Sequence, residues 1–275
     1  LPGWLVHFHP HSTMAAMDWM QLRRGQLDAF DRRTPVILPT AAVEQHGEHL
    51  PLGTDCMIVR AILDRLDKVM HHRFLVLPTQ QVACSEHHMG FPGSLTISHE
   101  TYRRSVMEAV VSATRHGFQR IMILNSHGGN QAINAVLGEQ IGQLYPDIEC
   151  LIANWWSISS PRTQSISEGG MLSTGHACEF ETSILLQIAP ELVDMTQAED
   201  GGIAHRTESM RFDMFQKGLA SSYRPYHELS HNGVYGKPSL ASAEKGQRIL
   251  EAAVVSIQEL IESFWEDVKQ LAAPE

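Results

Sequence analysis

Short motifs of histidine and carboxylate residues carry the clearest chemical signal in this chain. Glu44 and His46 lie in Glu-Gln-His-Gly, and Asp55 follows eleven residues after Glu44. His127 lies in Ser-His-Gly-Gly-Asn, and His176 lies in Gly-His-Ala-Cys-Glu. Imidazole and carboxylate groups without paired thiolates are a ligand set for Zn²⁺ or Mn²⁺. The motifs therefore predict a metal centre built from several parts of the chain.

The spacing of these residues supports that interpretation. In an extended stretch, Glu44 and His46 point their side chains the same way, so they could serve two adjacent ions. Asp55 lies near a predicted helix N-terminus, which tolerates an anionic bridging carboxylate. Gly128 and Gly129 remove side-chain bulk beside the histidine before them, as a close approach to a metal ion or substrate requires.

Apolar periodicity predicts that strands and helices alternate along the chain. The predicted strands are residues 35–39, 74–77, 121–124 and 148–153. The predicted helices are residues 18–32, 54–70, 98–117, 130–144, 181–188 and 242–271. Residues 201–239 have the composition of an irregular connection. Strands separated by helices indicate βαβ crossovers, a mostly parallel sheet and helices on both of its faces.

Every histidine-rich motif falls at or after the carboxyl end of a predicted strand. In open α/β sheets, ligands bind beyond these ends, so the motifs can converge on one crevice. The motif that contains His88 follows the second strand and is placed there by the same argument. His205, His227 and His231 lie in the irregular connection and could contact a substrate, although they rank below the motif residues.

Several residues also have plain structural interpretations. A single histidine is more often a core or surface residue than a ligand, and we interpret His71, His72 and His116 in that way. His49 is either a loop residue or one that orients the ligands. Trp155 and Trp156 are either core aromatics or a wall of the substrate site. The Gly-rich segment 126–130 could hold a phosphate, but it lacks the lysine and spacing of a P-loop.

The composition excludes several classes of protein. Acidic residues outnumber Lys and Arg by 31 to 21 among 275 residues, and this net charge of −10 argues against a nucleic-acid partner. No apolar run is long enough for a membrane span. The four cysteines form no Cys-x-x-Cys pair, so we expect free thiols and a cytoplasmic location. We expect one domain over residues 14–275, after an added or disordered extension over residues 1–13.

At these motifs the chain resembles the creatininase family of metal-dependent hydrolases. The matching segments keep a constant order: Glu44–Gly47 with Asp55, Phe91–Gly93, Asn125–Asn130, His176 with Phe180–Ser183, and Ala243–Gly246. The resemblance implies a three-layer α/β/α fold with a mostly parallel sheet. It also implies two divalent ions per subunit, Zn²⁺ or Mn²⁺ with Fe²⁺ also compatible, and a homo-oligomer, which we expect to be a hexamer.

The same resemblance implies how the two ions are divided among the ligands. Glu44, Asp55 and His127 would hold one ion. His46 and Asp55 would hold the other, with Asp55 bridging the pair.

Creatininase completes the second ion with a glutamate at the position that Gly129 occupies here, and we expect Glu179 to replace it. His176 matches the catalytic histidine of the family. We expect Glu181 to orient that histidine or to cap its helix, without binding metal. His88, Trp155 and the two glycines after the third strand are the candidate substrate contacts.

The activity implied by the resemblance is hydrolysis of a C–N bond in a small cyclic amide or formamide by a metal-activated water. His176 would move a proton to the leaving nitrogen. Gly129 and Leu172 differ from the residues that creatininase has at these two positions, a glutamate and a tryptophan, and these differences indicate a substrate other than creatinine. The alternatives are a hydrolase that opens a cyclic ketone at a C–C bond on the same site, and a non-catalytic metal-binding homologue.

Overall fold

The structure is a computed structural model, and it describes residues 18–203, 205, 207–216 and 218–271. The extension expected over residues 1–13 lies outside the described residues. The assignment of residues 14–275 to one domain stays a prediction.

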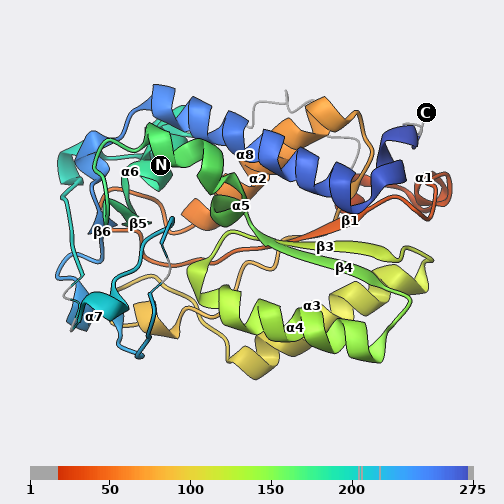
Figure 1. Cartoon of the computed structure of the whole chain (residues 1–275), viewed down its shortest axis with the longest axis horizontal. Helices are drawn as coiled ribbons and strands as arrows, with labels where there is room; N and C mark the ends of the chain where they lie inside the picture. Colours follow the sequence, from red (N-terminus) through yellow and green to blue (C-terminus); the bar gives the residue numbers. More distant parts are fainter. Residues whose placement is uncertain (1–17, 204, 206, 217, 272–275) are drawn as a thin grey trace, which may run out of the picture.

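A sheet of four parallel strands forms the centre of the molecule (Figure 1). Its strands are β1 (Val36–Thr40), β2 (Leu75–Val76), β3 (Arg120–Asn125) and β4 (Glu149–Asn154), in the order β2-β1-β3-β4. Thr40 pairs with Asn125, which pairs with Asn154, so the carboxyl ends of three strands lie level. The predicted parallel α/β architecture is confirmed.

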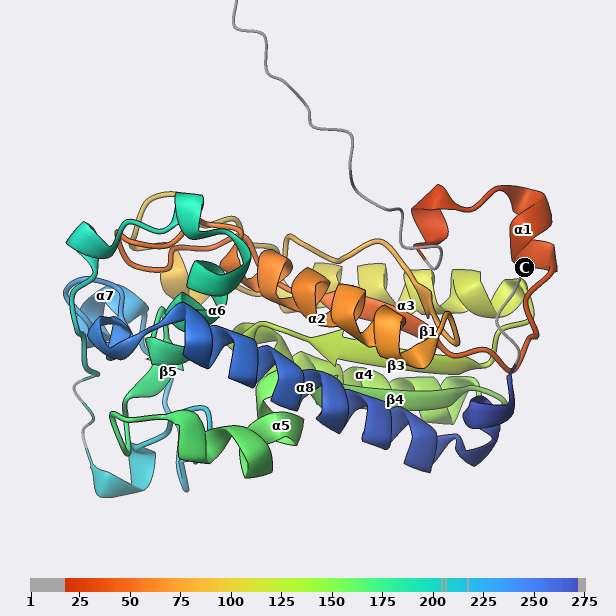
Figure 2. The same ribbon diagram turned by 90° about the horizontal axis from the view of Figure 1, so that it is seen from above.

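Helices cover both faces of this sheet (Figures 1 and 2). One face carries α2 (Thr54–Met70), α5 (Trp155–Thr163) and α8 (Ala243–Phe264), and α6 (Glu179–Ile188) packs against α8 and α2 near the carboxyl ends of the strands. The other face carries α3 (His99–Arg115) and α4 (Gln131–Leu144). Successive strand residues point to opposite faces, so Ile37 packs in the first core and Val36 and Leu38 in the second.

A second group of short elements lies beyond the carboxyl ends of the central strands (Figure 1). It contains the antiparallel pair β5 (Thr174–His176) and β6 (Tyr235–Gly236), and the one-turn helix α7 (Tyr226–Leu229). The 3-10 turn η2 (Glu86–His88) packs against α7. These short elements lie beside the crevice in which we predicted that the histidine motifs converge.

Two helix predictions were wrong in extent. The stretch 18–32 is not one helix, because η1 (Trp19–Gln21) and α1 (Arg24–Asp28) are separated by extended backbone at Leu22 and Arg23. Asp18 caps the first of these turns and pairs with Arg60 at 2.7 Å, which holds the turn against α2. The last helix ends at Phe264, and a separate 3-10 segment, η9 (Glu266–Gln270), follows buried Trp265. The sequence analysis missed α5, α7, β5 and β6, most of which are too short to show a period.

No helix among the described residues combines the length and the apolar character that a membrane crossing requires. All four cysteines are free, as expected.

Candidate metal centre

The loop after β1 presents Glu44 and His46, which are 1% and 0% exposed. Gly47, the next residue, has a φ of +66°, and a Cβ there would lie 2.8 Å from Val234. A side chain at this position would therefore be both strained and crowded. The glycine lets the chain turn back tightly after His46 and keeps both predicted ligands inside the molecule.

Asp55 and His127 reach the same place from two other elements. Asp55 lies in the first turn of α2 and is 2% exposed. His127 follows β3, where its backbone N–H donates to Asn125 Oδ1 at 3.2 Å and its carbonyl accepts from Asn125 Nδ2 at 2.7 Å. This clamp at the strand end fixes the direction in which the imidazole leaves the chain.

His176 ends β5, and Glu181 lies in the first turn of α6. Between them, Ala177 is fully buried with a φ of +50°, a left-handed conformation that costs an alanine about 1 kcal/mol. The chain reverses direction at this residue. The turn brings the imidazole and the carboxylate to the same side, facing the loop after β1.

The first ligand group contains Glu44, Asp55 and His127. The Nδ1 atom of His127 lies 3.1 Å from Glu44 Oε1 and 3.3 Å from Asp55 Oδ2. The Nε2–H of His127 donates to the carbonyl of Cys84 at 3.1 Å, which leaves Nδ1 with a free lone pair in the neutral ring. A lone pair beside two carboxylate oxygens is an arrangement that a cation stabilises.

The second ligand group contains His46, Asp55 and Glu181. The Nε2 atom of His46 lies 3.3 Å from Asp55 Oδ1 and 3.9 Å from Glu181 Oε1. Its Nδ1–H donates to the backbone carbonyl of Glu44 at 3.1 Å. Among the described residues, His46 Nε2, Asp55 Oδ2 and Glu181 Oε2 are buried and have no hydrogen-bond partner. Buried polar atoms almost always have a partner, so these three side chains have the chemistry and the placement to hold a divalent cation.

The charges of the two groups depend on one another. Burial would raise the pKa of Glu44, but His127 and its histidine neighbours hold that pKa well below its usual range. Burial would lower the pKa of His46, but the carboxylates of Asp55, Glu181 and Glu44 raise it to about 9. Burial raises the pKa of Glu181 to about 7. A divalent ion can displace the protons that these groups share, because metal ligands bind in their deprotonated forms.

His176 lies at the edge of both groups. Its ring centroid is 4.3 Å from that of His46, and its Nδ1 lies 3.7 Å from Glu44 Oε1. Its Nε2–H donates to the carbonyl of Gln45 at 2.8 Å, so the neutral ring presents a bare Nδ1. Burial lowers the pKa of His176 to about 3, with a contribution from the nearby His46. The imidazole of His176 is therefore neutral at neutral pH in the metal-free chain.

The structure does not bring Glu179 into either ligand group, which corrects the sequence-based expectation. Its fully buried carboxylate accepts from Lys245 Nζ at 2.7 Å and from Ser167 Oγ at 3.0 Å. Residues two apart on an α-helix are rotated by about 200°. Glu179 therefore faces α8, while Glu181 faces the ligands and takes the position that we expected for Glu179.

Trp155 also differs from its expected position as a substrate contact. It is 1% exposed and packs in the core, whereas Trp156 lines the cavity over the ligand groups. The helix α5 begins at Trp155, so the two indoles leave it about 100° apart and only one faces the cavity.

The remaining predicted site residues surround the centre. His88 is buried, and its Nε2 lies 3.5 Å from Glu44 Oε1. Gly128 and Gly129 line the cavity. His49 is one step removed: its Nε2 contacts the Thr182 hydroxyl at 2.9 Å, beside Glu181.

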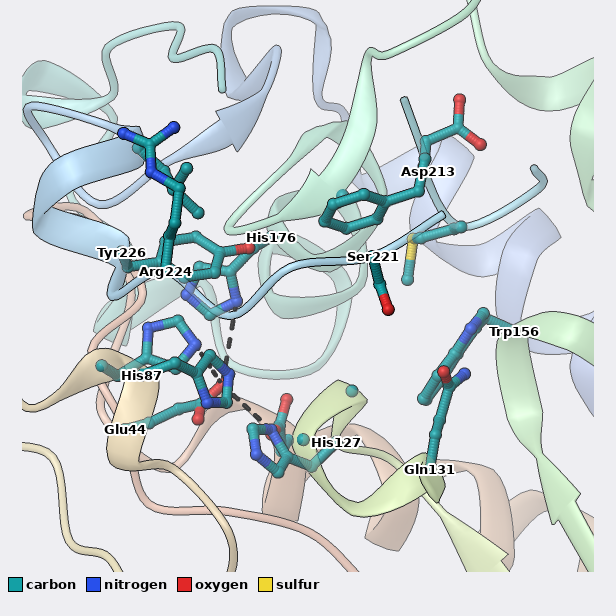
Figure 3. Close-up of a pocket in the computed structure, with 18 of the residues that line it drawn as sticks. Glu44, His87, His127, Gln131, Trp156, His176, Asp213, Ser221, Arg224 and Tyr226 are labelled. Carbon is teal, nitrogen blue, oxygen red and sulfur yellow. Dashed lines mark ion pairs between the residues drawn. The ribbon is translucent and has the colours of Figure 1, made fainter. Parts of the chain in front are cut away.

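A cavity of about 390 Å³ opens over the ligand groups. Figure 3 shows Glu44, His87 and His127 converging on one side of it, with Trp156 and Gln131 on another. Another wall comes from residues in 212–214 and 221–229, within the connection that looked irregular in the sequence. The residues that sequence analysis missed there are Phe212, Asp213, Met214, Ser221, Ser222, Tyr223, Arg224, Tyr226 and Leu229.

The histidines that we noted in the sequence of the connection did not predict this wall of the cavity. None of the three histidines that we noted in the connection lines the cavity, whereas His87 does and also groups with Glu44 and His127. Aromatic residues between Phe212 and Tyr226 were the available signal, but their spacing matches no helix or strand period.

Comparisons with known proteins find related sequences and structures over most of the chain. A family model described as creatinine amidohydrolase matches residues 15–261. The chain is 31% identical over 226 residues to a mycofactocin precursor peptide peptidase from Mycobacterium ulcerans, covering 80% of this chain and 81% of that one. It is 27% identical over 242 residues to a creatinine amidohydrolase from Pseudomonas putida (82% and 88%). It is 25% identical over 249 residues to a 3-dehydro-scyllo-inosose hydrolase from Thermotoga maritima (84% and 78%).

Solved structures share the fold. A provisionally named creatinine amidohydrolase from Bacteroides fragilis superposes with a TM-score of 0.79 at 26% identity, over 95% of this chain and 100% of that one. A manganese form of creatininase and a zinc–zinc form of a creatininase variant superpose with TM-scores of 0.73 and 0.74 at 23% and 24% identity, each over 90% of this chain and over 98% and 97% of theirs.

Proposed function

The chain belongs to the creatininase family of metal-dependent hydrolases, and on that premise we propose that it cleaves a C–N bond in a small cyclic amide or formamide at a binuclear metal site. The observation that carries the proposal is the set of buried atoms without hydrogen-bond partners, His46 Nε2, Asp55 Oδ2 and Glu181 Oε2, beside the bare Nδ1 of His127. Imidazole and carboxylate donors of this kind fit Zn²⁺ or Mn²⁺.

Two divalent ions, when bound, would supply an acidified water and polarise the substrate carbonyl. Glu44 and His127 would hold one ion and His46 and Glu181 the other, with Asp55 shared by both. In this proposal Glu181 replaces the glutamate that creatininase carries after its histidine ligand.

Gly129 supports that replacement on steric grounds. A Cβ at this position would lie 2.2 Å from the carbonyl oxygen of Cys84 and 2.4 Å from His127 Nε2. The backbone here leaves no room for a side-chain ligand at position 129. In the proposal the second ion would therefore take its carboxylate from α6, through Glu181.

His176 would move the proton. Its bare Nδ1 lines the cavity and can accept a proton from the attacking water and return it to the leaving nitrogen. The hydrogen bond from its Nε2 to the carbonyl of Gln45 keeps the ring in the required tautomer and stabilises the ring when it is charged. Glu44, 3.7 Å from Nδ1, adds to that stabilisation.

The test is a substrate panel with protein loaded with Mn²⁺ or Zn²⁺. The panel contains creatinine, lactams, imides, formamides, short peptides and ring ketones. We expect turnover of at least one cyclic amide or formamide and its loss in His176→Gln. His72→Gln, the same change at a half-buried histidine after α2, should retain the rate. A metal-loaded protein that hydrolyses no amide would contradict the proposal.

The ring ketones in the panel test a second activity, which is the opening of a ring at a C–C bond. The named activity of the Thermotoga maritima relative supports that alternative at 25% identity. Turnover of ring ketones alone would favour it over amide hydrolysis. Assembly into a hexamer also stays a proposal, for which light scattering of the purified protein is the measurement.

A further inference from the structure

The phenol of Tyr226 faces the metal centre but belongs to neither ligand group. This residue begins α7, in the connection between α6 and β6, and is 9% exposed. Its ring centroid lies 4.3 Å from that of His88, 5.2 Å from that of His176 and 5.8 Å from that of His87. Contacts with three imidazoles from two other elements hold the phenol ring in one orientation.

The hydroxyl of Tyr226 makes no hydrogen bond with any described residue, unlike the hydroxyls of the two comparable buried tyrosines. The Tyr102 hydroxyl donates to Asn134 Oδ1 at 2.8 Å, and the Tyr235 hydroxyl donates to the carbonyl of Phe212. The Tyr226 hydroxyl oxygen is not among the buried atoms that lack a partner, so it is accessible from the cavity that this residue lines. The free hydroxyl of Tyr226 is therefore an unused donor.

This donor points into the catalytic cavity. Tyr226 lines the cavity, and Figure 3 shows its hydroxyl oxygen near His176, directed toward the side of the view where Ser221 lies. Burial, with the charges of Glu44 and Glu181, holds the pKa of this phenol well above its usual range. The hydroxyl therefore keeps its proton at neutral pH.

We propose that the hydroxyl of Tyr226 donates a hydrogen bond to the carbonyl oxygen of the substrate and holds that oxygen as negative charge develops on it. This role rests on the proposed hydrolysis. The phenol proton stays on Oη throughout, because the proton for the leaving nitrogen comes from His176. A donor held in place before reaction stabilises the transition state more than the bound substrate, so its removal lowers kcat more than it raises KM.

Tyr226→Phe is the direct test, since it keeps the ring and its contacts with the imidazoles and removes only Oη. The matched control is Tyr145→Phe, at the end of α4 far from the cavity. Both variants are loaded with Mn²⁺ and assayed with the panel compound that the wild-type protein hydrolyses fastest. We expect kcat of Tyr226→Phe to fall by about 10- to 100-fold, toward the range seen when one oxyanion donor is removed.

Three further measurements make the outcome decisive. KM within about threefold of wild type, two bound ions per chain and an unchanged melting temperature are expected alongside the lower kcat. An unchanged kcat overturns the role of Tyr226 and leaves the proposed hydrolysis standing. A fall in kcat that comes with lost metal or a lowered melting temperature also overturns it, because the phenol would then be structural. A wild-type protein that binds metal and hydrolyses no panel amide overturns the proposed hydrolysis, and the role of Tyr226 with it.

Discussion

The ammonium group of Lys245 lies 2.7 Å from the fully buried carboxylate of Glu179, and this ion pair joins α8 to α6. Lys245 also donates to the carbonyl of Leu240 at 2.6 Å. Glu181, two residues along α6, faces the opposite direction and meets His46. One turn of helix therefore presents two buried glutamates with different partners, Lys245 for Glu179 and the candidate metal centre for Glu181.

Exchanging each glutamate for glutamine should separate those tasks. Glu179→Gln removes the buried carboxylate beside the Lys245 ammonium and leaves only the exposed Glu168, at 3.2 Å, as its charged partner, so the free energy of unfolding should fall by up to about 3 kcal/mol. Its metal content should not change. Glu181→Gln should lose the second ion while the metal-free protein unfolds at a similar urea concentration. Urea denaturation and elemental analysis of both variants measure the two quantities. Metal loss in Glu179→Gln with full retention in Glu181→Gln would reverse our assignment.

Removing the shared carboxylate should damage the site more than any other single change. Asp55→Ala should reduce the metal content from two ions per chain to one or none. It should lower kcat/KM by more than about 100-fold, the upper range for residues that only orient ligands. Asp64→Ala is the control, because Asp64 lies on the same helix, is 44% exposed and pairs with Arg60 at the surface. Full metal content in Asp55→Ala would show that this residue does not bridge the ions.

The neighbouring glycines of the segment after β3 should respond differently to the same substitution. Gly129→Ala places a Cβ 2.2 Å from the Cys84 carbonyl, and we expect a loss of about 1–3 kcal/mol in stability together with weaker metal binding. A Cβ at Gly128 meets no atom within 4 Å, so Gly128→Ala should unfold at nearly the wild-type temperature. Calorimetry of both variants makes the comparison, and equal melting temperatures would contradict the close packing around Gly129.

The metal-free protein should lose stability as the pH rises from 7 to 9. The pKa of His46 is about 9 in the folded chain against an ordinary value of 6.5. Its contribution, about 3 kcal/mol, is complete below pH 6.5 and is lost as the pH rises through 9. His127, whose pKa is also raised, acts in the same direction. The pKa of His176 is about 3, so this residue is neutral in both states and adds nothing in this range.

The measurement is the melting temperature across that pH range, in EDTA and in saturating Mn²⁺. Bound metal replaces the protons on the ligands, so the fall with pH should disappear or reverse in Mn²⁺. A melting temperature in EDTA that stays constant between pH 7 and pH 9 would contradict the raised pKa values.

The sequence predicted the central part of the fold because strong local signals mark it. The apolar stripe of α2 and the runs that form β1 and β3 are long enough for their period to be recognised, and the motif residues follow the strand ends. Glu44, Asp55 and His127 could be placed together because the carboxyl ends of parallel strands meet at one edge of a sheet. The binding roles of these residues remain a prediction that the metal analyses test.

The sequence did not show how α5 and α6 are rotated about their axes, and therefore which of their side chains face the cavity. Glu179 and Glu181 lie in one short motif, as do Trp155 and Trp156, and both members of each pair have the residue type that the site requires. Only the start of α6 and of α5 decides which member faces the cavity, and a shift of one residue rotates a side chain by about 100°.

The sequence by itself determined the residue types of a metal centre and the parallel sheet that presents them, because motif spacing and apolar period are properties of local chain. The tertiary structure alone decided that Glu181 faces His46, that Lys245 pairs with Glu179, and that the ring of Tyr226 packs against the imidazoles. These relationships join residues far apart in the chain through packing, and no local period encodes packing between distant segments.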